Sequence, residues 1–340
     1  MNIALISLNK YGDIIGEKIN GVIPVNIFSK SKIKNFKITK LAEELIKNYD
    51  VIIFISSTGI AVRAIAPFIK NKTEDPAVIV VDILGKYVIS LLSGHLGGAN
   101  EFSEKIAEII NAEAVITTAT DNLNLESPDI IAKENKLIID NMKEAKCISA
   151  LMVNGENIGF EDEENLIQLP KGYTTDLEIA RGIVYVTNKL NYLKGYDNTV
   201  KLKLIRKNII IGIGCRKNYS AETMNGIVRE KLKEHNIDER AVKIVASSSV
   251  KSEEKAIVEL GEFLGAQFRT FSNEDIKTVQ YKYKGSKFVE EHIGVKAVCE
   301  PCVELSGGKI LVSKLNLSGM TLCIGVEVIH NSQCTNYNSQ

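Results

Sequence analysis

The chain has 340 residues, of which 45% are apolar and 25% are charged, and its 42 Lys and Arg side chains balance its 42 Asp and Glu side chains. This length is too great for one ordinary core and predicts two or three globular domains. A formal net charge of zero creates no overall field that would attract nucleic acid or an anionic membrane, and Trp, a base-stacking residue, is absent. We therefore expect neither nucleic acid nor a membrane as a partner.

Targeting signals are absent from the sequence pattern. No apolar run approaches the roughly 20 residues that cross a bilayer, and residues 1–8 lack the basic region and cleavage site of a signal peptide. The six cysteines are scattered along the chain instead of being spaced as a disulfide framework. These features predict a cytoplasmic protein with reduced thiols. The pattern leaves open whether the protein forms a homodimer.

The first 134 residues alternate between strand and helix patterns. Short apolar runs predict strands at 2–8, 51–55, 77–81, 87–91 and 114–118. Helical spacing of apolar residues predicts helices at 38–48, 58–66 and 98–111. Strands that alternate with helices in this way predict a largely parallel sheet covered by helices on both faces. Residues 1–134 are therefore expected to form a Rossmann-like, three-layer α/β/α domain.

Residues 135–207 are rich in Asn and Lys and have weak hydrophobic periodicity. We predict a small irregular middle region or linker there, with short strands at 158–160 and 183–187. The strand–helix alternation returns at residue 208 and predicts a second Rossmann-like domain over residues 208–329. Its expected strands are 209–213, 242–246, 267–271, 310–312 and 322–328. Its expected helices are 221–235, for which Ser220 is the N-cap, 253–264, and one that starts at 272. A polar tail follows at 330–340, and the fold class is α/β.

A glycine-rich loop, Ser93-Gly94-His95-Leu96-Gly97-Gly98-Ala99-Asn100, joins the strand at 87–91 to the next helix. Small residues let a ligand approach the backbone, and unpaired amides at a helix N-terminus favour anions or carbonyl oxygens. A histidine in that setting can act as a general base or bind a carboxylate. The alternative is a tight turn whose histidine caps the helix. We prefer the functional interpretation because a turn needs fewer of these residues.

Two further loops follow predicted strands of the same domain. Ser56–Gly59 offers hydroxyls that can cap a helix or bind an acidic group, and Arg63, one turn further, is either a carboxylate clamp or an ordinary surface residue. Thr117–Asp121 ends in an acid that can orient His95 or serve as a capping or turn residue. The carboxyl ends of parallel strands meet at one edge of a sheet. We therefore predict that the three loops converge.

The second domain carries Gly212-Ile213-Gly214-Cys215-Arg216-Lys217 after its first strand. This segment resembles the start of a dinucleotide-binding turn, but Lys217 stands where the third glycine is required, and no acidic residue ends the next strand. We therefore reject binding of a nicotinamide dinucleotide. Arg216 and Lys217 instead indicate a carboxylate-bearing ligand.

The segment Cys299-Glu300-Pro301-Cys302 has half of the spacing of a zinc site. Only isolated histidines, His292 and His330, could complete such a site. We expect buried or incidental thiols, with Pro301 in the first turn of a helix.

Long stretches of the chain resemble the cobalt-precorrin-5A hydrolases of cobalamin biosynthesis, including their variable middle segment. In the N-terminal part the resemblance rests on residues 58–63, 66–67, 75–78, 89–100 and 116–121. In the C-terminal part it rests on residues 212–216, 246–248, 288–289 and 300–301. One departure is Cys299 and Cys302, which stand where that family usually has small apolar residues. This departure weakens a catalytic role for the two thiols.

The resemblance implies a cobalt-bearing corrin precursor with a δ-lactone on ring A as the substrate. Water opens the lactone, and a carbon with its methyl group leaves as acetaldehyde, which gives cobalt-precorrin-5B in the anaerobic route to vitamin B12. Because the cobalt arrives with the substrate, we expect no metal site and no cofactor in the protein. The alternative is a non-catalytic carrier of cobalt-corrinoids in the same pathway.

For this chemistry we predict two catalytic residues, His95 to activate water and Asp121 to orient His95 or handle a proton. The amides of Gly97 and Gly98 are expected to stabilise the oxyanion, and Arg63, Arg216 and Lys217 to bind peripheral carboxylates. The predicted substrate-binding residues are Ser57, Thr58, Gly59, Arg63, Ser93, Gly94, Gly97, Gly98, Asn100, Thr118, Thr120, Gly214, Arg216 and Lys217.

Overall fold

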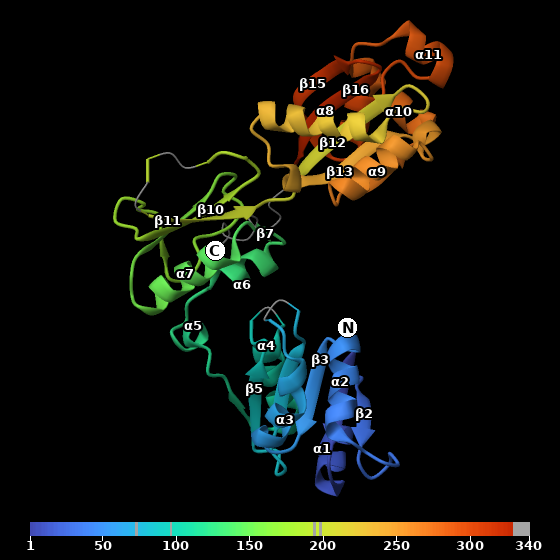
Figure 1. Cartoon of the computed structure of the whole chain (residues 1–340). Coiled ribbons are helices and arrows are strands. Elements are labelled where there is room, and N and C mark those ends of the chain that lie inside the picture. The colour runs from blue at the N-terminus through green and yellow to red at the C-terminus, as the bar shows by residue number, and fades with distance from the viewer. Residues whose placement is uncertain (72–73, 96, 193–194, 197–198, 329–340) are drawn as a thin grey trace, which may run out of the picture. The chain divides into compact units, whose positions relative to one another are not determined.

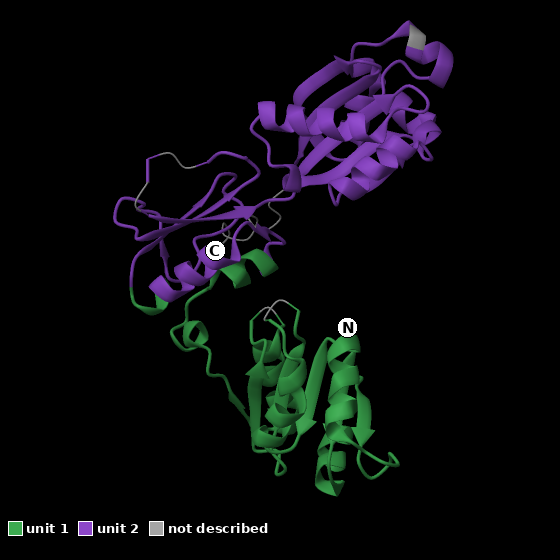
Figure 2. Cartoon of the chain, viewed as in Figure 1, with its two compact units in different colours: residues 1–133, 152–155 green, residues 134–151, 156–340 purple. Residues whose placement is uncertain are grey.

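The structure is a computed structural model that describes residues 1–71, 74–95, 97–192, 195–196 and 199–328. The chain divides into two compact units, residues 1–133 with 152–155 and residues 134–151 with 156–340 (Figure 2). The polar tail predicted at 330–340 lies outside the described residues. Within the described ranges, no helix has both the length and the apolar content that crossing a bilayer requires.

One six-stranded sheet forms the centre of the N-terminal unit. Its strands are β1 (Ile3–Ser7), β2 (Asn26–Ser29), β3 (Val51–Ile55), β4 (Ala77–Val81), β5 (Tyr87–Leu92) and β6 (Glu113–Val115), in the order β2-β1-β3-β4-β5-β6. Figure 1 labels β2, β3 and β5 of this sheet. The apolar runs of β1, β3 and β4 are buried along their whole length. Continuous apolar runs suit these strands because both faces of the sheet are covered.

Helices cover both faces of this sheet, as the sequence predicts. Apolar side chains of α1 (Lys10–Asn20) and α4 (Ala99–Ile110) pack with Leu5 and Ile53 on one face. Those of α2 (Ile38–Asn48) and α3 (Thr58–Ile65) pack with Ile6 and Phe54 on the other. The remaining helices of the chain's first part are η1 (Ala66–Phe68), α5 (Ala119–Asn122) and α6 (Pro128–Glu134).

Strand direction within this sheet reverses between β4 and β5. Strands β1 to β4 are parallel, but β5 is antiparallel to β4, and β6 is parallel to β5. The reversal arises at a tight turn after β4, where the Asp82 carboxylate accepts hydrogen bonds from the amides of Leu84, Lys86 and Tyr87. The carboxyl ends of β5 and β6 therefore lie at the edge opposite to those of β1 and β3.

The middle region is not an irregular linker, which corrects the sequence prediction. Its strands β7 (Ile138–Ile139), β8 (Ile158–Asp162), β9 (Tyr173–Thr174), β10 (Gly182–Thr187) and β11 (Val200–Ile205) form a five-stranded sheet in the order β7-β11-β10-β8-β9. Helix α7 (Met142–Val153) accompanies this sheet. The predicted strands at 158–160 and 183–187 are confirmed. The sheet escaped prediction because two of its strands have only two residues each, and one of them, β7, pairs with the distant β11.

The C-terminal part contains a second layered α/β domain. Its strands are β12 (Ile209–Cys215), β13 (Val242–Ser248), β14 (Gln267–Phe271), β15 (Gly308–Leu317) and β16 (Met320–Glu327), in the order β14-β13-β12-β16-β15. Its helices are α8 (Ala221–Glu234), η2 (Glu239–Ala241), η3 (Ser249–Lys251), α9 (Lys255–Phe263), α10 (Asn273–Val279), η4 (Gln280–Lys282), α11 (Lys287–Ile293) and α12 (Cys299–Leu305). Side chains of α8 and α9 pack on one face and those of α10 and α12 on the other.

Local signals in this domain behave as the sequence predicts. The Ser220 side chain caps α8 by accepting a hydrogen bond from the amide of Thr223. Ser272 and Asp275 form a reciprocal capping box at the start of α10. Pro301 lies in the first turn of α12, where a missing amide proton costs nothing.

Candidate functional site

The glycine-rich loop folds tightly upon itself between β5 and α4. A Cβ atom on Gly94 would lie 2.7 Å from Oδ1 of Asn100, and one on Gly97 would lie 2.8 Å from the carbonyl oxygen of Ser93. Gly98, with φ of 83°, provides the left-handed residue before α4, and Ser93 also has a positive φ of 58°. A non-glycine residue in this region stores strain, which is typical of functional loops.

Asn100 connects this loop to the two elements beside it. Its Oδ1 accepts a hydrogen bond from the Ser90 hydroxyl at 2.6 Å, while its Nδ2 donates to Thr118 Oγ1 at 3.1 Å and to Asp121 Oδ2 at 2.5 Å. Only 9% of Asn100 is exposed. The residue therefore holds the Asp121 carboxylate in place and positions the site, although the sequence suggested substrate contact.

His95 lies beside residues of α5, the short helix that follows β6. Its Nε2 is 3.0 Å from the Thr120 hydroxyl and 3.7 Å from Oδ2 of Asp121. The imidazole is mostly buried, with 15% of its side chain exposed. The structure thus brings His95 and Asp121 together, but the hydrogen-bonding partner of Nε2 is Thr120. A substrate contact had been predicted for Thr120.

Lys133 in α6 is a functional candidate that the sequence analysis missed. Its ammonium group donates a hydrogen bond to the carbonyl oxygen of His95 at 3.3 Å, and lies 3.6 Å from where a Cβ of Gly98 would stand. No motif surrounds Lys133, and it follows the loop by more than thirty residues. Only the folded chain brings this positive charge to the loop.

Three amides of the loop, those of Gly98, Ala99 and Asn100, donate hydrogen bonds within the loop. The amide of Gly98 donates to the His95 carbonyl at 3.1 Å, that of Ala99 to Ser93, and that of Asn100 to Gly94. The predicted oxyanion role of Gly98 is therefore wrong for this conformation, because a tight turn satisfies its N–H internally. The positive charge of Lys133 lies near the same point.

The loop at Ser56–Gly59 does not join this site, so the predicted convergence of three loops is wrong. Ser93 donates to the carbonyl of Asp75 before β4, whereas the amide of Ser56 donates to the carbonyl of Val81 at the other end of β4. The reason is the reversed direction of β5, which carries its loop to the opposite edge. Ser57, Thr58, Gly59 and Arg63 belong to the Ser56 edge.

At the Ser56 edge, Arg63 is exposed. Within the described residues, its guanidinium forms a hydrogen bond only with its own helix, α3. Its Nη1 donates to the carbonyl oxygen of Gly59 at 3.4 Å. Ser56 is buried and its hydroxyl donates to the carbonyl of Ser57. These residues lie beside the carboxyl ends of β1 and β3, where open α/β sheets commonly bind ligands. Their binding roles stay predictions.

Gly212 in β12 serves packing. A Cβ on Gly212 would lie 1.9 Å from the carbonyl oxygen of Cys299, so this glycine lets the start of α12 approach the strand. The backbone amide of Arg216 donates to the carbonyl of Gly319, and the Arg216 guanidinium lies 5.6 Å from the centre of the Tyr219 ring. The sequence resemblance to a nucleotide-binding turn thus reflects close backbone packing.

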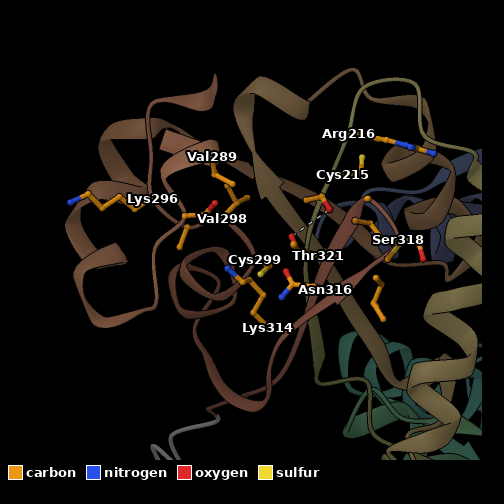
Figure 3. A pocket seen from close by; sticks show the side chains of 16 residues that line it. Cys215, Arg216, Val289, Lys296, Val298, Cys299, Lys314, Asn316, Ser318 and Thr321 are labelled. Atoms are coloured by element: carbon orange, nitrogen blue, oxygen red, sulfur yellow. Dashed lines mark hydrogen bonds between the residues drawn. The ribbon is translucent and has the colours of Figure 1, made fainter. Parts of the chain in front are cut away.

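Arg216 and Lys217 line different cavities, although the sequence grouped them. Arg216 and Gly214 border a cavity of about 540 Å³ (Figure 3), whereas Lys217 borders one of about 620 Å³ with Lys251 and Glu254. Both residues follow the end of β12 at Cys215, where the chain has left the strand. Their contribution to carboxylate binding stays a prediction.

The thiols of the predicted half-zinc segment are buried. Burial raises the pKa of Cys299 to about 11 and raises the pKa of Cys302 and of the neighbouring Cys323 as well. In the part of the chain that the structure describes, no group of three or more His, Cys, Asp or Glu side chains is placed to hold a metal ion. His330 lies outside the described residues.

Comparisons with known proteins extend this picture over the whole chain. Models of three domains match in order: Cobalamin synthesis G N-terminal over residues 40–121, Cobalamin biosynthesis central region over 126–196, and Cobalamin synthesis G C-terminus over 209–325. A protein of Salmonella typhimurium named cobalt-precorrin-5A hydrolase is 29% identical, covering 96% of this chain and 97% of its own. A protein of Priestia megaterium with the same name is 28% identical, covering 85% of this chain and 81% of its own.

Among solved structures, a cobalamin biosynthesis protein G homolog from Sulfolobus solfataricus matches with a TM-score of 0.41 at 23% identity, covering 96% of this chain and 97% of that one. The three domain models follow one another along most of the sequence, and the Salmonella typhimurium relative is matched over nearly its full length. The chain belongs to the cobalamin synthesis G family that its motifs resemble.

Proposed function

We propose that the chain is a cobalt-precorrin-5A hydrolase, which opens the ring A δ-lactone of its cobalt-corrinoid substrate and releases acetaldehyde. Membership of the family and the names of the full-length relatives support this reaction class. The structural observation that carries the proposal is the grouping of His95, Asp121 and Lys133 at one glycine-rich loop. A proton acceptor beside a fixed positive charge suits attack of water on an ester carbonyl.

The proposed reaction needs one water molecule and neither an oxidant nor a reductant. The oxygen of water bonds to the lactone carbonyl carbon, the ring C–O bond breaks, and ring A keeps a carboxylate. The released oxygen stays as a hydroxyl on the carbon that bears the methyl group. When that hydroxyl loses its proton, a C=O bond forms as the carbon breaks away from the macrocycle. The macrocycle retains the electron pair and takes up a proton, and acetaldehyde leaves.

His95, Asp121 and Lys133 have separate roles in the proposed reaction. His95 accepts the proton of the attacking water; a proton on Nε2 that is donated to Thr120 leaves Nδ1 as the basic nitrogen. Asp121, which Asn100 holds 3.7 Å from the imidazole, stabilises the imidazolium that forms. Lys133 stabilises the negative charge that develops on the lactone oxygen or on the new carboxylate. The cobalt is part of the substrate.

Purified protein incubated with the lactone-bearing cobalt-precorrin should release acetaldehyde, which can be trapped and measured against substrate consumed. His95→Ala should lower kcat by about 10²–10⁴-fold because general-base catalysis contributes that much. His235→Ala is a matched control, since His235 is an exposed residue after α8, and it should keep full activity.

Two outcomes would contradict these assignments. A His95→Ala protein with full acetaldehyde release would remove His95 from the mechanism. Folded wild-type protein that binds the authentic substrate but releases no acetaldehyde would contradict the hydrolase proposal, and would favour a corrinoid carrier instead.

A further inference from the structure

The C-terminal domain contains a cavity that the proposed chemistry does not use. It has a volume of about 540 Å³, within the usual range for small-molecule sites. Its walls are the end of β12, the start of α11, the loop before α12 and the hairpin of β15 and β16. The site around His95 belongs to the other compact unit, so the residues lining this cavity are a separate set.

Apolar side chains make up most of the cavity wall. Val289, Val298, Leu317 and Met320 contribute this surface. Polar groups are concentrated on the β15–β16 hairpin, where Lys314, Asn316 and Thr321 lie close to the Cys299 thiol (Figure 3). The Thr321 hydroxyl donates to the carbonyl of Gly214 at 3.4 Å. An apolar cavity with a few convergent polar groups is the usual form of a ligand site.

Lys314 supplies the charge of this site. It is half-buried, and no acidic side chain among the described residues forms an ion pair with it. Glu300 accepts a hydrogen bond from the Lys314 backbone amide at 3.2 Å, and not from the ammonium group. A half-buried ammonium group without an ionic partner has lost part of its hydration, so binding of an anion is favourable.

The other two cations of the cavity are less suited to this role. Lys296 lies 3.9 Å from Glu290 and is 57% exposed. Arg216 is exposed, and its side chain extends from the far side of the cavity, against Gly319 and over the Tyr219 ring (Figure 3). Because Lys314 stands nearest the polar floor, we assign it the main contact and give Arg216 a contact at the rim.

We propose that this cavity is a second binding site for the corrinoid, in which an apolar edge of the macrocycle packs on the valine-lined wall and one peripheral carboxylate pairs with Lys314. This inference rests on the proposed function for the identity of the ligand. A carboxylate suits the site better than a phosphate, because a single lysine flanked by one amide and one hydroxyl offers few donors for a phosphate group.

The test uses the full chain and cobyrinic acid, a corrinoid whose peripheral side chains end in carboxylic acids. Its fully methylated ester serves as the uncharged probe. Binding is measured by isothermal titration calorimetry. Wild-type protein should bind the acid, and Lys314→Met should raise its Kd about tenfold or more while leaving the Kd of the ester unchanged, because only the charged contact is lost. Lys314→Glu should weaken binding of the acid further.

Lys309→Met is the matched control because Lys309 is an exposed lysine on the same strand, β15, and does not line the cavity. It should bind cobyrinic acid as the wild type does. Coincident thermal unfolding of both methionine variants excludes a general loss of structure. Absence of binding to wild-type protein, or equal Kd values for the wild type and Lys314→Met, would overturn the second site.

The acetaldehyde assay separates this inference from the proposed function. If both hold, wild-type protein should release acetaldehyde, and Lys314→Met should bind cobyrinic acid more weakly while its kcat stays unchanged. Acetaldehyde release together with unaltered cobyrinic acid binding in Lys314→Met overturns the second site alone. Weakened binding in that variant, with no acetaldehyde from wild-type protein, supports the site and contradicts the proposed reaction.

Discussion

Asn100 shows how a single side chain organises the candidate site. Its amide group accepts one hydrogen bond from Ser90 and donates two, to Thr118 and Asp121, and it is almost fully buried. Asn100, at the start of α4, thus links β5 with the segment that holds Thr118 and Asp121. The Asp121 carboxylate is partly exposed, with 30% of its side chain accessible, so its place depends on this contact.

Asn100→Ala should therefore reduce both stability and activity. Loss of a buried hydrogen-bonded group costs about 1–3 kcal/mol of unfolding free energy, and a displaced Asp121 should lower kcat more than it raises KM. Urea unfolding and steady-state acetaldehyde release measure the two effects. Asn122→Ala, an exposed change in the neighbouring α5, should alter the unfolding free energy by less than about 0.5 kcal/mol. Equal behaviour of the two variants would contradict a positioning role for Asn100.

The thiols also differ residue by residue. Cys147 is exposed, whereas Cys299, Cys302 and Cys323 are buried. Burial raises the pKa of Cys215 and of Cys299 to about 11, so both remain thiols at pH 8. Alkylating reagents react with the thiolate, which these residues form only at higher pH.

Iodoacetamide at pH 8 should therefore modify Cys147 in the native protein and leave Cys299, Cys302 and Cys323 unmodified. Peptide mass spectrometry measures the labelling of each residue, and unfolding in urea should make all of them reactive. Native labelling of Cys299 at the rate of Cys147 would contradict the buried placement of α12.

At the scale of elements, Gly212 sets how closely α12 packs against β12 in the C-terminal domain. The carbonyl oxygen of Cys299 at the start of α12 lies where a side chain of Gly212 would stand. Because the obstructing atom belongs to the backbone, it cannot move aside as a flexible side chain can. The helix carries Cys299 and Val298 precedes it, so the same contact also shapes the cavity proposed above.

Gly212→Ala should lower the unfolding free energy by about 3 kcal/mol or more, because an added methyl group forces the helix away from the sheet. Gly226→Ala in α8 is the matched change, since no atom lies within 4 Å of the added Cβ. It should raise the unfolding free energy by about 0.5–1 kcal/mol, the usual gain of alanine over glycine within a helix. Urea unfolding measures both, and a tolerated Gly212→Ala would contradict the close contact.

At the scale of the whole molecule, a buried charge network joins the middle sheet to the C-terminal domain. Lys203 in β11 donates to Asp238 at 2.8 Å, and the exposed fractions of their side chains are 3% and 2%. Arg240 binds Asp238 as well and reaches Asp140 at 2.6 Å. These contacts agree with the assignment of both regions to one compact unit.

Asp238→Asn should destabilise this unit by about 3–5 kcal/mol, because it leaves the Lys203 ammonium buried without a counter-charge. Asp176→Asn is the control, since Asp176 is an exposed acid of the same unit. Thermal unfolding followed by circular dichroism measures the difference. A Tm for Asp238→Asn equal to that of the control would contradict the network's contribution.

The same residue predicts how stability depends on pH. Burial opposes ionisation of Asp238, but hydrogen bonds from Arg240 and Lys203 outweigh it and lower its pKa from 3.8 to about 2. A lowered pKa means that the folded state holds this proton less tightly than the unfolded state. The stabilisation is therefore complete above pH 3.8 and is lost as the pH falls towards 2.

Much of the fold was predictable because its signals are local. Buried strands leave continuous apolar runs, as in β3, and capping residues such as Ser220 mark helix starts. Helix α1 was not predicted, and two of its three buried positions are Gly12 and Gly16, which add no apolar side chain to its core-facing side. The middle sheet was missed because its shortest strands, β7 and β9, have only two residues each, and the partner of β7 lies far along the chain.

The candidate site was predictable only in part. The glycine-rich loop, His95 and Asp121 are recognisable because the loop is a contiguous motif and the acid follows the next strand. Lys133 was not, because a lone lysine in α6 has no sequence signature and acts through its position in space. The wrong placement of Ser57, Thr58, Gly59 and Arg63 has one cause, the assumption that every strand runs in the same direction.

The sequence by itself determined the α/β class, the family and the identity of the glycine-rich loop, because each depends on residues that are adjacent or regularly spaced. Tertiary structure alone decided which loops share a sheet edge, which side chain holds Asp121 and which lysine faces the cavity between β15 and α12. These outcomes depend on strand direction and on contacts between distant segments. No local pattern encodes them, because a strand has the same periodicity in either direction.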